Sequence, residues 1–247
     1  MNGRDLGSKT AKGGFRNEDD VVRKFNNWRN DETAQEWLKS MHYKIGEIES
    51  VFAVKIHGYK TDVQVQVTIK LKQAIDSQNL SVKLVSNKQG FNQVDKRKIE
   101  KYVEMWGIPK DIEEILKSFT GEKKPSKKQV KDSRRMFLTE MPTESQNKIV
   151  NFFSKNKILV ISDILKGRGK LSANWMLVIL KENKKGYEWV LKDINSAMNI
   201  FGQGEVKITN KGSLKIGEIT MQRKGGDAGR ESAKMLQFKI NPRLLFE

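Results

Sequence analysis

Residues Thr61–Lys72 (TDVQVQVTIKLK) alternate strictly between polar and apolar side chains over twelve positions. Successive side chains of a β-strand point to opposite faces of a sheet, so this period of two predicts a half-buried strand. Leu80–Val85 (LSVKLV) predicts a second strand, with a turn around Asp76–Asn79 between the two. The short connection favours an antiparallel pair. A chain that contains this pair must build a sheet and bury one of its faces.

Helical periodicity flanks this pair of strands. Apolar residues three and four positions apart predict a helix that Asn17 caps, with Glu18 in its acidic first turn, and a second helix that starts at Asp31 or Thr33. Further helices are expected over Gln93–Trp106, Lys110–Phe119 and from Thr143 to Phe153, and further extended segments over 45–58, Ile158–Ile161, Met176–Leu180, Val206–Thr209, Ile216–Gln222 and Leu236–Ile240. This mixture predicts an α/β fold, with a central mixed sheet flanked by helices.

Length and composition limit the class of protein. The 247 residues suit one domain with a substantial core, and the absence of Cys excludes disulfides, Cys-ligated zinc, iron–sulfur centres and thiol catalysis. The two histidines are too few for a His-rich metal site. No apolar run approaches the roughly 20 residues of a membrane span, and no apolar leader is present, so we expect a cytoplasmic protein without membrane association. We also expect residues 1–14 to be mobile and 120–135 to form a basic, linker-like segment.

The charge balance points to a polyanionic partner. Lys and Arg number 47 against 30 Asp and Glu, a net charge of +17, and the excess gathers in clusters at 122–135, 166–170 and 223–230. Clusters separated by structured segments favour a site that wraps a polyanion, of which nucleic acid is the most common. The alternative is a generally basic surface without a specific partner.

Asp62 and Lys83 are the residues on the predicted strand pair that can carry chemistry. A carboxylate holds a hard divalent ion that polarises a phosphate, and a neighbouring lysine orients the attacking water and offsets negative charge. Ser81 and Lys83 share one face of their strand because they are two positions apart. The same residue types are also common on solvent-facing strands, so the spacing alone does not decide the function.

Longer stretches of the chain resemble a known enzyme family. Asp62, eighteen intervening residues and Ser81-Val82-Lys83 are similar to the PD-(D/E)XK nuclease signature. Four further strings resemble type II restriction endonucleases: GFRNEDDVVRKFNNW (14–28), GFNQVDKRKIEKY (90–102), ILKGRGKLSANWMLV (164–178) and MQRKGGDAGRESAKMLQFKINP (221–242). The resemblance is to HinP-type enzymes, which are related to MspI. It implies a restriction-endonuclease-like core and Mg²⁺-dependent cleavage of double-stranded DNA at GCGC, after the first G, with two-base 5′ overhangs.

One position departs from the family pattern. Ser81 stands where an acidic residue is usual, and a hydroxyl is a poorer Mg²⁺ ligand than a carboxylate. The backbone carbonyl of Val82 and the carboxylate of Glu18 are therefore candidates to complete a metal site with Asp62, although Glu18 could equally serve only to stabilise its helix. Gln64 lies on the same face as Asp62 and is interpreted as an ordinary exposed polar residue.

Three segments are candidates for contact with DNA. The first is the loop over residues 87–93 with the start of the predicted helix that follows. Its amides could bond base edges, its aromatic side chain could wedge into a base step, and its cations could reach guanine or phosphates: Gln89, Asn92 and Gln93; Phe91; Lys96 and Arg97. Phe91 could also fold back against the sheet edge. Lys166 and Arg168 are expected to contact phosphates, and Gln222, Arg223 and Lys224 precede two glycines that allow close approach to DNA. The size and the resemblance favour a monomer or a weak homodimer. Two other functions stay open: a non-catalytic nucleic-acid-binding protein, and a structure-selective nuclease such as a junction resolvase.

Overall fold

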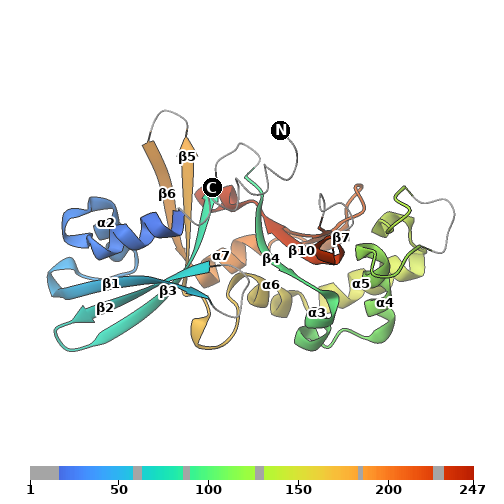
Figure 1. Ribbon diagram of the computed structural model, residues 1–247, viewed down its shortest axis with the longest axis horizontal. Helices are drawn as coiled ribbons and strands as arrows, with labels where there is room; N and C mark the ends of the chain where they lie inside the picture. The colour runs from blue at the N-terminus through green and yellow to red at the C-terminus, as the bar shows by residue number, and fades with distance from the viewer. Residues whose placement is uncertain (1–16, 58–62, 86–89, 126–130, 183–185, 225–230) are drawn as a thin grey trace. The chain divides into compact units, whose positions relative to one another are not determined.

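The computed structural model describes residues 17–57, 63–85, 90–125, 131–182, 186–224 and 231–247. The expected mobility of residues 1–14 lies outside the described residues. The chain divides into two compact units. Figure 1 labels the helices and strands that form them. The first unit comprises 1–92, 165–198 and 242–247, and the second comprises 93–164 and 199–241. The expectation of a single domain stays a prediction.

The first unit is built on a five-stranded sheet with the order β1-β2-β3-β5-β6. Its strands are β1 (Ile48–His57), β2 (Val63–Leu71), β3 (Ile75–Val85), β5 (Trp175–Glu182) and β6 (Gly186–Asp193). β3 and β5 run parallel, whereas the other neighbours are antiparallel. Parallel neighbours need a long crossover, and here the chain between β3 and β5 supplies residues 93–164 of the second unit. The sheet is mixed, as predicted.

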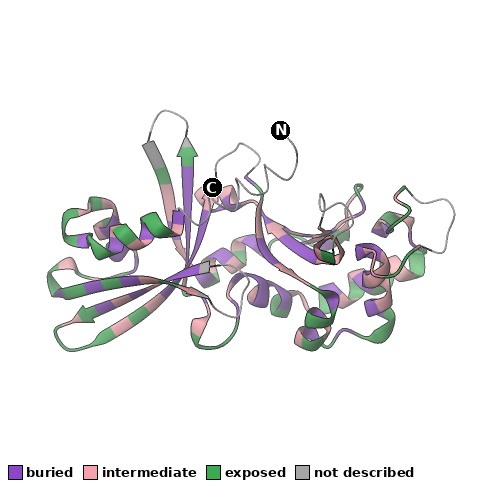
Figure 2. Ribbon diagram, in the orientation of Figure 1, coloured by how far each residue is buried: buried purple, intermediate pink, exposed green. Residues whose placement is uncertain are grey.

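Helices bury one face of this sheet. A helix over residues 17–26 and α2 (Glu32–Ser40) supply Phe25, Trp37 and Leu38 to a cluster that also contains Val65, Val67 and Ile69. Asp31 caps α2, since its Oδ1 accepts a hydrogen bond from the Ala34 N–H at 3.0 Å. The predicted alternation of β2 is confirmed because its odd-numbered residues 65, 67 and 69 are fully buried. Figure 2 shows that buried residues also run along β5.

The predicted turn around Asp76–Asn79 is wrong. These residues belong to β3, and the chain turns earlier, where the Leu71 N–H donates to the Ala74 carbonyl at 2.8 Å. The polar side chains of this segment have partners in the sheet unit: Tyr43 Oη donates to the Asp76 carboxylate, and Gln78 Nε2 donates to Asp76 Oδ2 at 2.9 Å. Composition suggested a turn, but these tertiary partners stabilise a strand.

The second unit contains another five-stranded sheet, ordered β4-β10-β9-β8-β7. Its strands are β4 (Asn92–Arg97), β7 (Val206–Ile208), β8 (Leu214–Ile216), β9 (Ile219–Arg223) and β10 (Leu236–Ile240). Between β4 and β5 the chain forms α3 (Ile99–Trp106), α4 (Lys110–Thr120), α5 (Thr143–Lys155) and α6 (Lys157–Leu165). Helix α7 (Ile194–Phe201) lies between β6 and β7 in the sequence. Short 3₁₀ helices are Trp28–Asn30, Ile45–Glu47, Leu138–Glu140, Gly169–Leu171, Glu231–Lys234 and Pro242–Phe246. Among the described helices, none is long and apolar enough to cross a membrane.

Two predicted elements of the second unit are wrong in type. Residues 92–97 form strand β4, and the helix expected from Gln93 begins only at Ile99. Asp95 explains the change, because it is fully buried on β4 and accepts a hydrogen bond from Tyr102 Oη at 2.6 Å. Ile158–Ile161, expected as a strand, lies in helix α6, where Val160, Ile161 and Ile164 recur at helical spacing in the core. A short apolar run does not distinguish the two structures.

Candidate active site and nucleic-acid interface

The pairing of β2 with β3 decides which side chains share a face. The register runs from Val65 opposite Leu80 to Lys70 opposite Ile75. Gln66 Nε2 donates to Asn79 Oδ1 across this register at 3.0 Å, so even positions of β2 and odd positions of β3 point to the same side. Gln64, Ser81 and Lys83 therefore share that side, which is opposite the helical core.

These three side chains are almost completely removed from solvent. Gln64 and Ser81 are each 1% exposed, and Lys83 is 5% exposed. The expectation that Gln64 is an ordinary exposed polar residue is wrong. Both its amide atoms are buried and find no hydrogen-bond partner within the described part of the chain. A buried amide without a partner is unfavourable, which makes Gln64 a candidate to contact a ligand or substrate group.

The other metal-site candidates are placed in part. Asp62 and Gln89 lie outside the described residues. The Val82 side chain belongs to the apolar cluster under the helices, on the opposite side of β3 from Lys83. Glu18 lies in the helix over 17–26, which is tied to β1 because Ala53 N donates to Asn26 Oδ1 at 2.7 Å. Among the described residues, no three His, Cys, Asp or Glu side chains gather as a metal cluster.

The segment around β4 presents one exposed aromatic and one constrained cation. Phe91 is 57% exposed. It follows Gly90, which has a positive φ of 68° and whose carbonyl accepts a hydrogen bond from Asn92 Nδ2 at 2.9 Å. Phe91 thus does not fold back into the sheet edge. Lys96 and Arg97 lie on β4 rather than on a helix, and Arg97 Nε is paired with buried Asp95 at 3.0 Å. Gln93 is half-buried on the same strand.

The loop that carries Lys166 and Arg168 is fixed to the first sheet. Asn79 Nδ2 donates to the carbonyls of Lys170 and Ser172 at 3.1 and 3.0 Å, and Asn174 Oδ1 accepts from the Asn79 N–H. Arg168 is exposed at the tip between Gly167 and Gly169, both with positive φ, whereas Lys166 is half-buried. One side chain of β3 therefore holds a basic loop in place.

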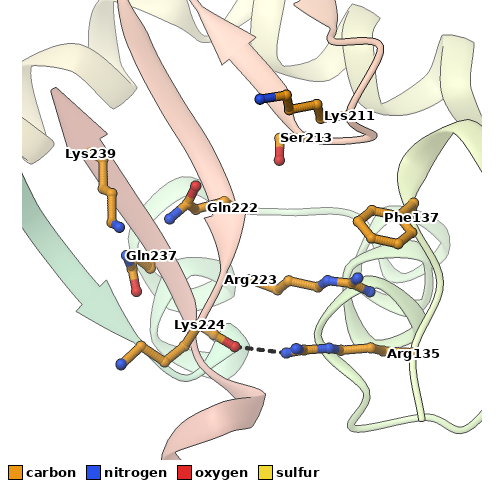
Figure 3. Close-up of a pocket in the computed structure, with 9 residues that line it drawn as sticks. All are labelled: Arg135, Phe137, Lys211, Ser213, Gln222, Arg223, Lys224, Gln237 and Lys239. Carbon is orange, nitrogen blue, oxygen red and sulfur yellow. Dashed lines mark hydrogen bonds between the residues drawn. The ribbon is translucent and has the colours of Figure 1, made fainter. Parts of the chain in front are cut away.

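A basic pocket lies in the second unit. Among the described residues, its lining includes five cations and no acidic side chain, and Figure 3 draws these cations: Arg135, Lys211, Arg223, Lys224 and Lys239. Gln222, Gln237, Ser213 and Phe137 complete the wall. The predicted trio Gln222, Arg223 and Lys224 is brought together here, at the end of β9. Five cations lie in this lining, one of which, Arg135, is paired with the acid Asp132 at 3.0 Å, and this excess of positive charge favours an anionic ligand.

Two residues that sequence reasoning missed hold this trio. The Arg223 guanidinium lies 3.7 Å from the centroid of the Phe137 ring, and Arg135 Nη1 donates to the Lys224 carbonyl at 2.7 Å. Burial, together with the positive charge of Arg135, lowers the pKa of Arg223 to about 10. Arg135 itself is paired with Asp132 at 3.0 Å, so the described end of the linker-like segment is docked. These are contacts between positions about 90 residues apart, which no local pattern reveals.

The fold and these sites can now be compared with known proteins. The family model of the R.HinP1I restriction endonuclease matches residues 41–246. The chain belongs to the R.HinP1I restriction endonuclease family. Among solved structures, it is similar to restriction endonuclease MspI in complex with its cognate DNA, with a TM-score of 0.64 and 12% identity over 97% of this chain and 93% of that one. That likeness shows a shared fold. No curated protein sequence matches the chain significantly.

Membership of the R.HinP1I family confirms the resemblance drawn from the sequence. The chain is a type II restriction endonuclease, a site-specific deoxyribonuclease. The non-catalytic binding protein and the junction resolvase are therefore set aside. The roles of individual residues stay predictions.

Proposed function

We propose that this restriction endonuclease hydrolyses double-stranded DNA at GCGC, after the first G, and that it requires Mg²⁺. Besides family membership, the observation that supports this most is the shared, buried side of Gln64, Ser81 and Lys83. In this proposal, the Asp62 carboxylate and the Lys83 ammonium act on one phosphate.

The donor atoms on this side suit a hard cation. The Asp62 carboxylate would be the principal ligand, and the unpartnered Gln64 amide supplies an oxygen of the kind that such ions accept. The Val82 carbonyl and Glu18 are further candidates. When bound, Mg²⁺ polarises the scissile phosphate and lowers the pKa of a bound water. These residues would hold the ion with one carboxylate and neutral oxygens. The second carboxylate of the PD-(D/E)XK signature is replaced here by Ser81.

The side chains of the chain itself have distinct roles in this proposal. Lys83 orients the attacking water and stabilises the charge that develops on the phosphate, in a setting from which water is largely excluded. Ser81 contributes a hydroxyl at the position where the family usually has an acid. Gln64 holds an oxygen in place. Because all three are buried on one sheet, their geometry is set before the substrate arrives.

DNA recognition is assigned to the basic and amide-bearing segments. Phe91 is exposed at a turn and would wedge into a base step, and Gln89, Asn92 and Gln93 would contact bases. Lys96, Lys166 and Arg168 would contact phosphates. Arg97 would contribute mainly through its pair with Asp95. Gln222, Arg223 and Lys224 would approach the DNA from the basic pocket. We also propose action as a monomer or weak homodimer in the cytoplasm.

A plasmid digest tests the proposal. The full chain is incubated with supercoiled plasmid and MgCl₂, with and without EDTA, and the fragment ends are sequenced. Discrete fragments with ends at G↓CGC, abolished by EDTA, are expected. Cleavage at another sequence would overturn the GCGC assignment, and undiminished cleavage in EDTA would overturn the requirement for metal.

A further inference from the structure

Gln237 lies at the floor of the basic pocket, outside every segment predicted to touch DNA. It is on β10, directly opposite Gln222 on β9 in the antiparallel register. Both side chains line the pocket, and Figure 3 shows them between Lys239 and Lys224. Gln237 is only 4% exposed, so its conformation is fixed by packing.

Two atoms of this pocket have no partner among the described residues. The Gln237 side-chain oxygen, Oε1, is buried and accepts no hydrogen bond, and Arg223 Nη1 is buried and donates none. Arg223 cannot swing away freely, because its guanidinium is stacked on Phe137 at 3.7 Å. Within the described part of the chain, the pocket therefore holds one unsatisfied acceptor and one unsatisfied donor. Buried groups of this kind are unfavourable unless a ligand satisfies them.

The chemistry of these two atoms restricts the ligand. A phosphodiester has acceptor oxygens but no hydrogen to donate, so it can satisfy Arg223 but not the Gln237 oxygen. The edge of a base pair presents both kinds of group. In the major groove, guanine offers N7 and O6 as acceptors, and its cytosine partner offers the N4 amino group as a donor. Arginine to guanine is also the most common specific contact in protein–DNA complexes.

We propose that Arg223 and Gln237 together bind the major-groove edge of one G·C base pair, which makes Gln237 a specificity-determining residue. The surrounding lysines hold the flanking phosphates and carry no sequence information. The proposal rests on the proposed function, because it assumes that the DNA substrate enters this pocket. It adds a residue and a base-pair class to that function.

Cleavage of a duplex library randomised across the cut site tests the role of Gln237. Gln237→Ala removes the side chain, and Gln237→Met removes the amide while keeping its volume. Sequencing of the cleaved ends from each variant gives the preference at every base pair. We expect the G·C preference to fall roughly 10- to 100-fold at one base pair and its symmetry mate, with other positions unchanged.

Lys239→Met is the matched control. Lys239 is two positions along β10 from Gln237 and lines the same pocket, but it carries a charge instead of an amide. This variant should cleave all sequences more weakly and lose part of its salt dependence, without any change in preference. If Gln237→Ala fails to fold, circular dichroism will show it, and the Met variant supplies the test because it leaves no cavity.

The outcomes separate the two proposals. A wild-type consensus that both Gln237 variants retain overturns the role of Gln237 and leaves the nuclease function intact. Equal loss at every position also overturns it, since Gln237 would then be only structural. A changed preference at an A·T pair overturns the G·C assignment. A wild-type enzyme without any cleavage of the library overturns the proposed function, and the inference with it.

Discussion

The two units place their functional side chains in opposite physical settings. In the first unit, one cation, Lys83, sits with neutral Gln64 and Ser81 on a side of the sheet where each is at most 5% exposed. In the second unit, five cations line a pocket whose described residues include no acidic side chain. Groups held in a buried, low-dielectric setting act strongly at short range, whereas clustered surface cations act over longer distances and are screened by salt.

Because of this contrast, substitutions in the two units should affect different properties of the enzyme. Removing a buried group of the first unit should reduce the rate of cleavage without much effect on DNA affinity. Removing a cation of the second unit should reduce affinity, and most strongly at low salt, because salt screens the lost contact. Weaker binding after loss of one of these buried groups, or a slower maximal rate after loss of a pocket cation, would show that this division between buried chemistry and pocket binding is wrong.

The largest expected effect is on cleavage by Lys83→Ala. Loss of the ammonium removes a preorganised positive charge beside the scissile phosphate, so single-turnover cleavage should fall roughly 10²- to 10³-fold or more. Asp62→Ala should have a similar effect. DNA affinity, measured by fluorescence anisotropy with Ca²⁺ in place of Mg²⁺, should change little.

Lys70→Ala is the control for Lys83. Lys70 lies on the neighbouring strand β2, but it is exposed and pairs with Glu49 at 2.8 Å. Its loss should leave cleavage unchanged. Full activity of Lys83→Ala would remove the assigned site altogether.

The next effect concerns Gln64, whose buried amide has no partner among the described residues. Gln64→Leu removes an unsatisfied polar group, so the free energy of unfolding should be unchanged or larger. Cleavage should nevertheless fall roughly 10- to 100-fold, and the Mg²⁺ concentration for half-maximal rate should rise. Urea unfolding and a Mg²⁺ titration of the rate measure the two effects separately.

Gln66→Leu gives the opposite pattern on the same face. Gln66 donates to Asn79 Oδ1, and its loss leaves that acceptor without a donor, at a cost of about 1–3 kcal/mol in unfolding free energy. Its Mg²⁺ requirement should not change. If Gln64→Leu instead loses stability and keeps its Mg²⁺ requirement, the residue is structural.

The sequence predicted the pair of strands that carries the candidate active site, for a clear physical reason. Twelve alternating residues specify which face of β2 is buried, and Val65, Val67 and Ile69 are indeed fully buried. The same alternation misled the interpretation of Gln64, because it shows which residues face away from one core but not what covers the other face. The length of β3 was missed because Asp76 and Gln78 are stabilised by the distant Tyr43.

Failures in the second unit have the same origin in long-range contacts. Helical spacing over residues 93–106 could not reveal that Asp95 is buried on a strand against Tyr102. Nor could composition reveal that Arg135, in a segment expected to be a linker, bonds the backbone of Lys224. The candidate DNA-binding cations were visible in the sequence, but the residues that position them were not.

Arg135 therefore provides the third prediction, on positioning rather than contact. Arg135→Ala removes the bond to the Lys224 carbonyl and a support of the Arg223–Lys224 segment, so DNA affinity should weaken about tenfold. The maximal rate at saturating DNA should be retained, which a general loss of folding would not allow. Arg135→Lys should recover little, because one ammonium cannot reproduce the fork that joins Asp132 to Lys224.

Arg134→Ala is the matched control, since Arg134 neighbours Arg135, contacts the same Asp132 and is exposed. Its affinity for DNA should change much less. Equal loss in both variants would mean that charge, and not positioning, explains the effect.

A smaller effect is expected at the loop fixed by Asn79. Lys166→Ala should weaken binding to all sequences alike and reduce the slope of log affinity against log salt by about one. Gln93→Ala should instead relax the choice of sequence. Competition binding with specific and scrambled duplexes at several salt concentrations distinguishes them, and identical behaviour of the two variants would remove the division between phosphate and base contacts.

The smallest effect is the pH dependence of stability from Asp132. Burial alone would raise the pKa of Asp132. Hydrogen bonds from Arg134 and Arg135 outweigh this effect and lower that pKa from 3.8 to about 2. The folded state therefore binds this proton less readily than the unfolded state, so the ion pairs stabilise the fold above pH 4 and the contribution is lost as the pH falls towards 2. Asp132→Asn should lower the urea midpoint slightly at neutral pH, and the difference from wild type should vanish near pH 2. If the difference in urea midpoint between wild type and Asp132→Asn stayed constant with pH, the Asp132 charge would not hold Arg134 and Arg135 in place. Arg135 would then be positioned by its contacts with the backbone alone.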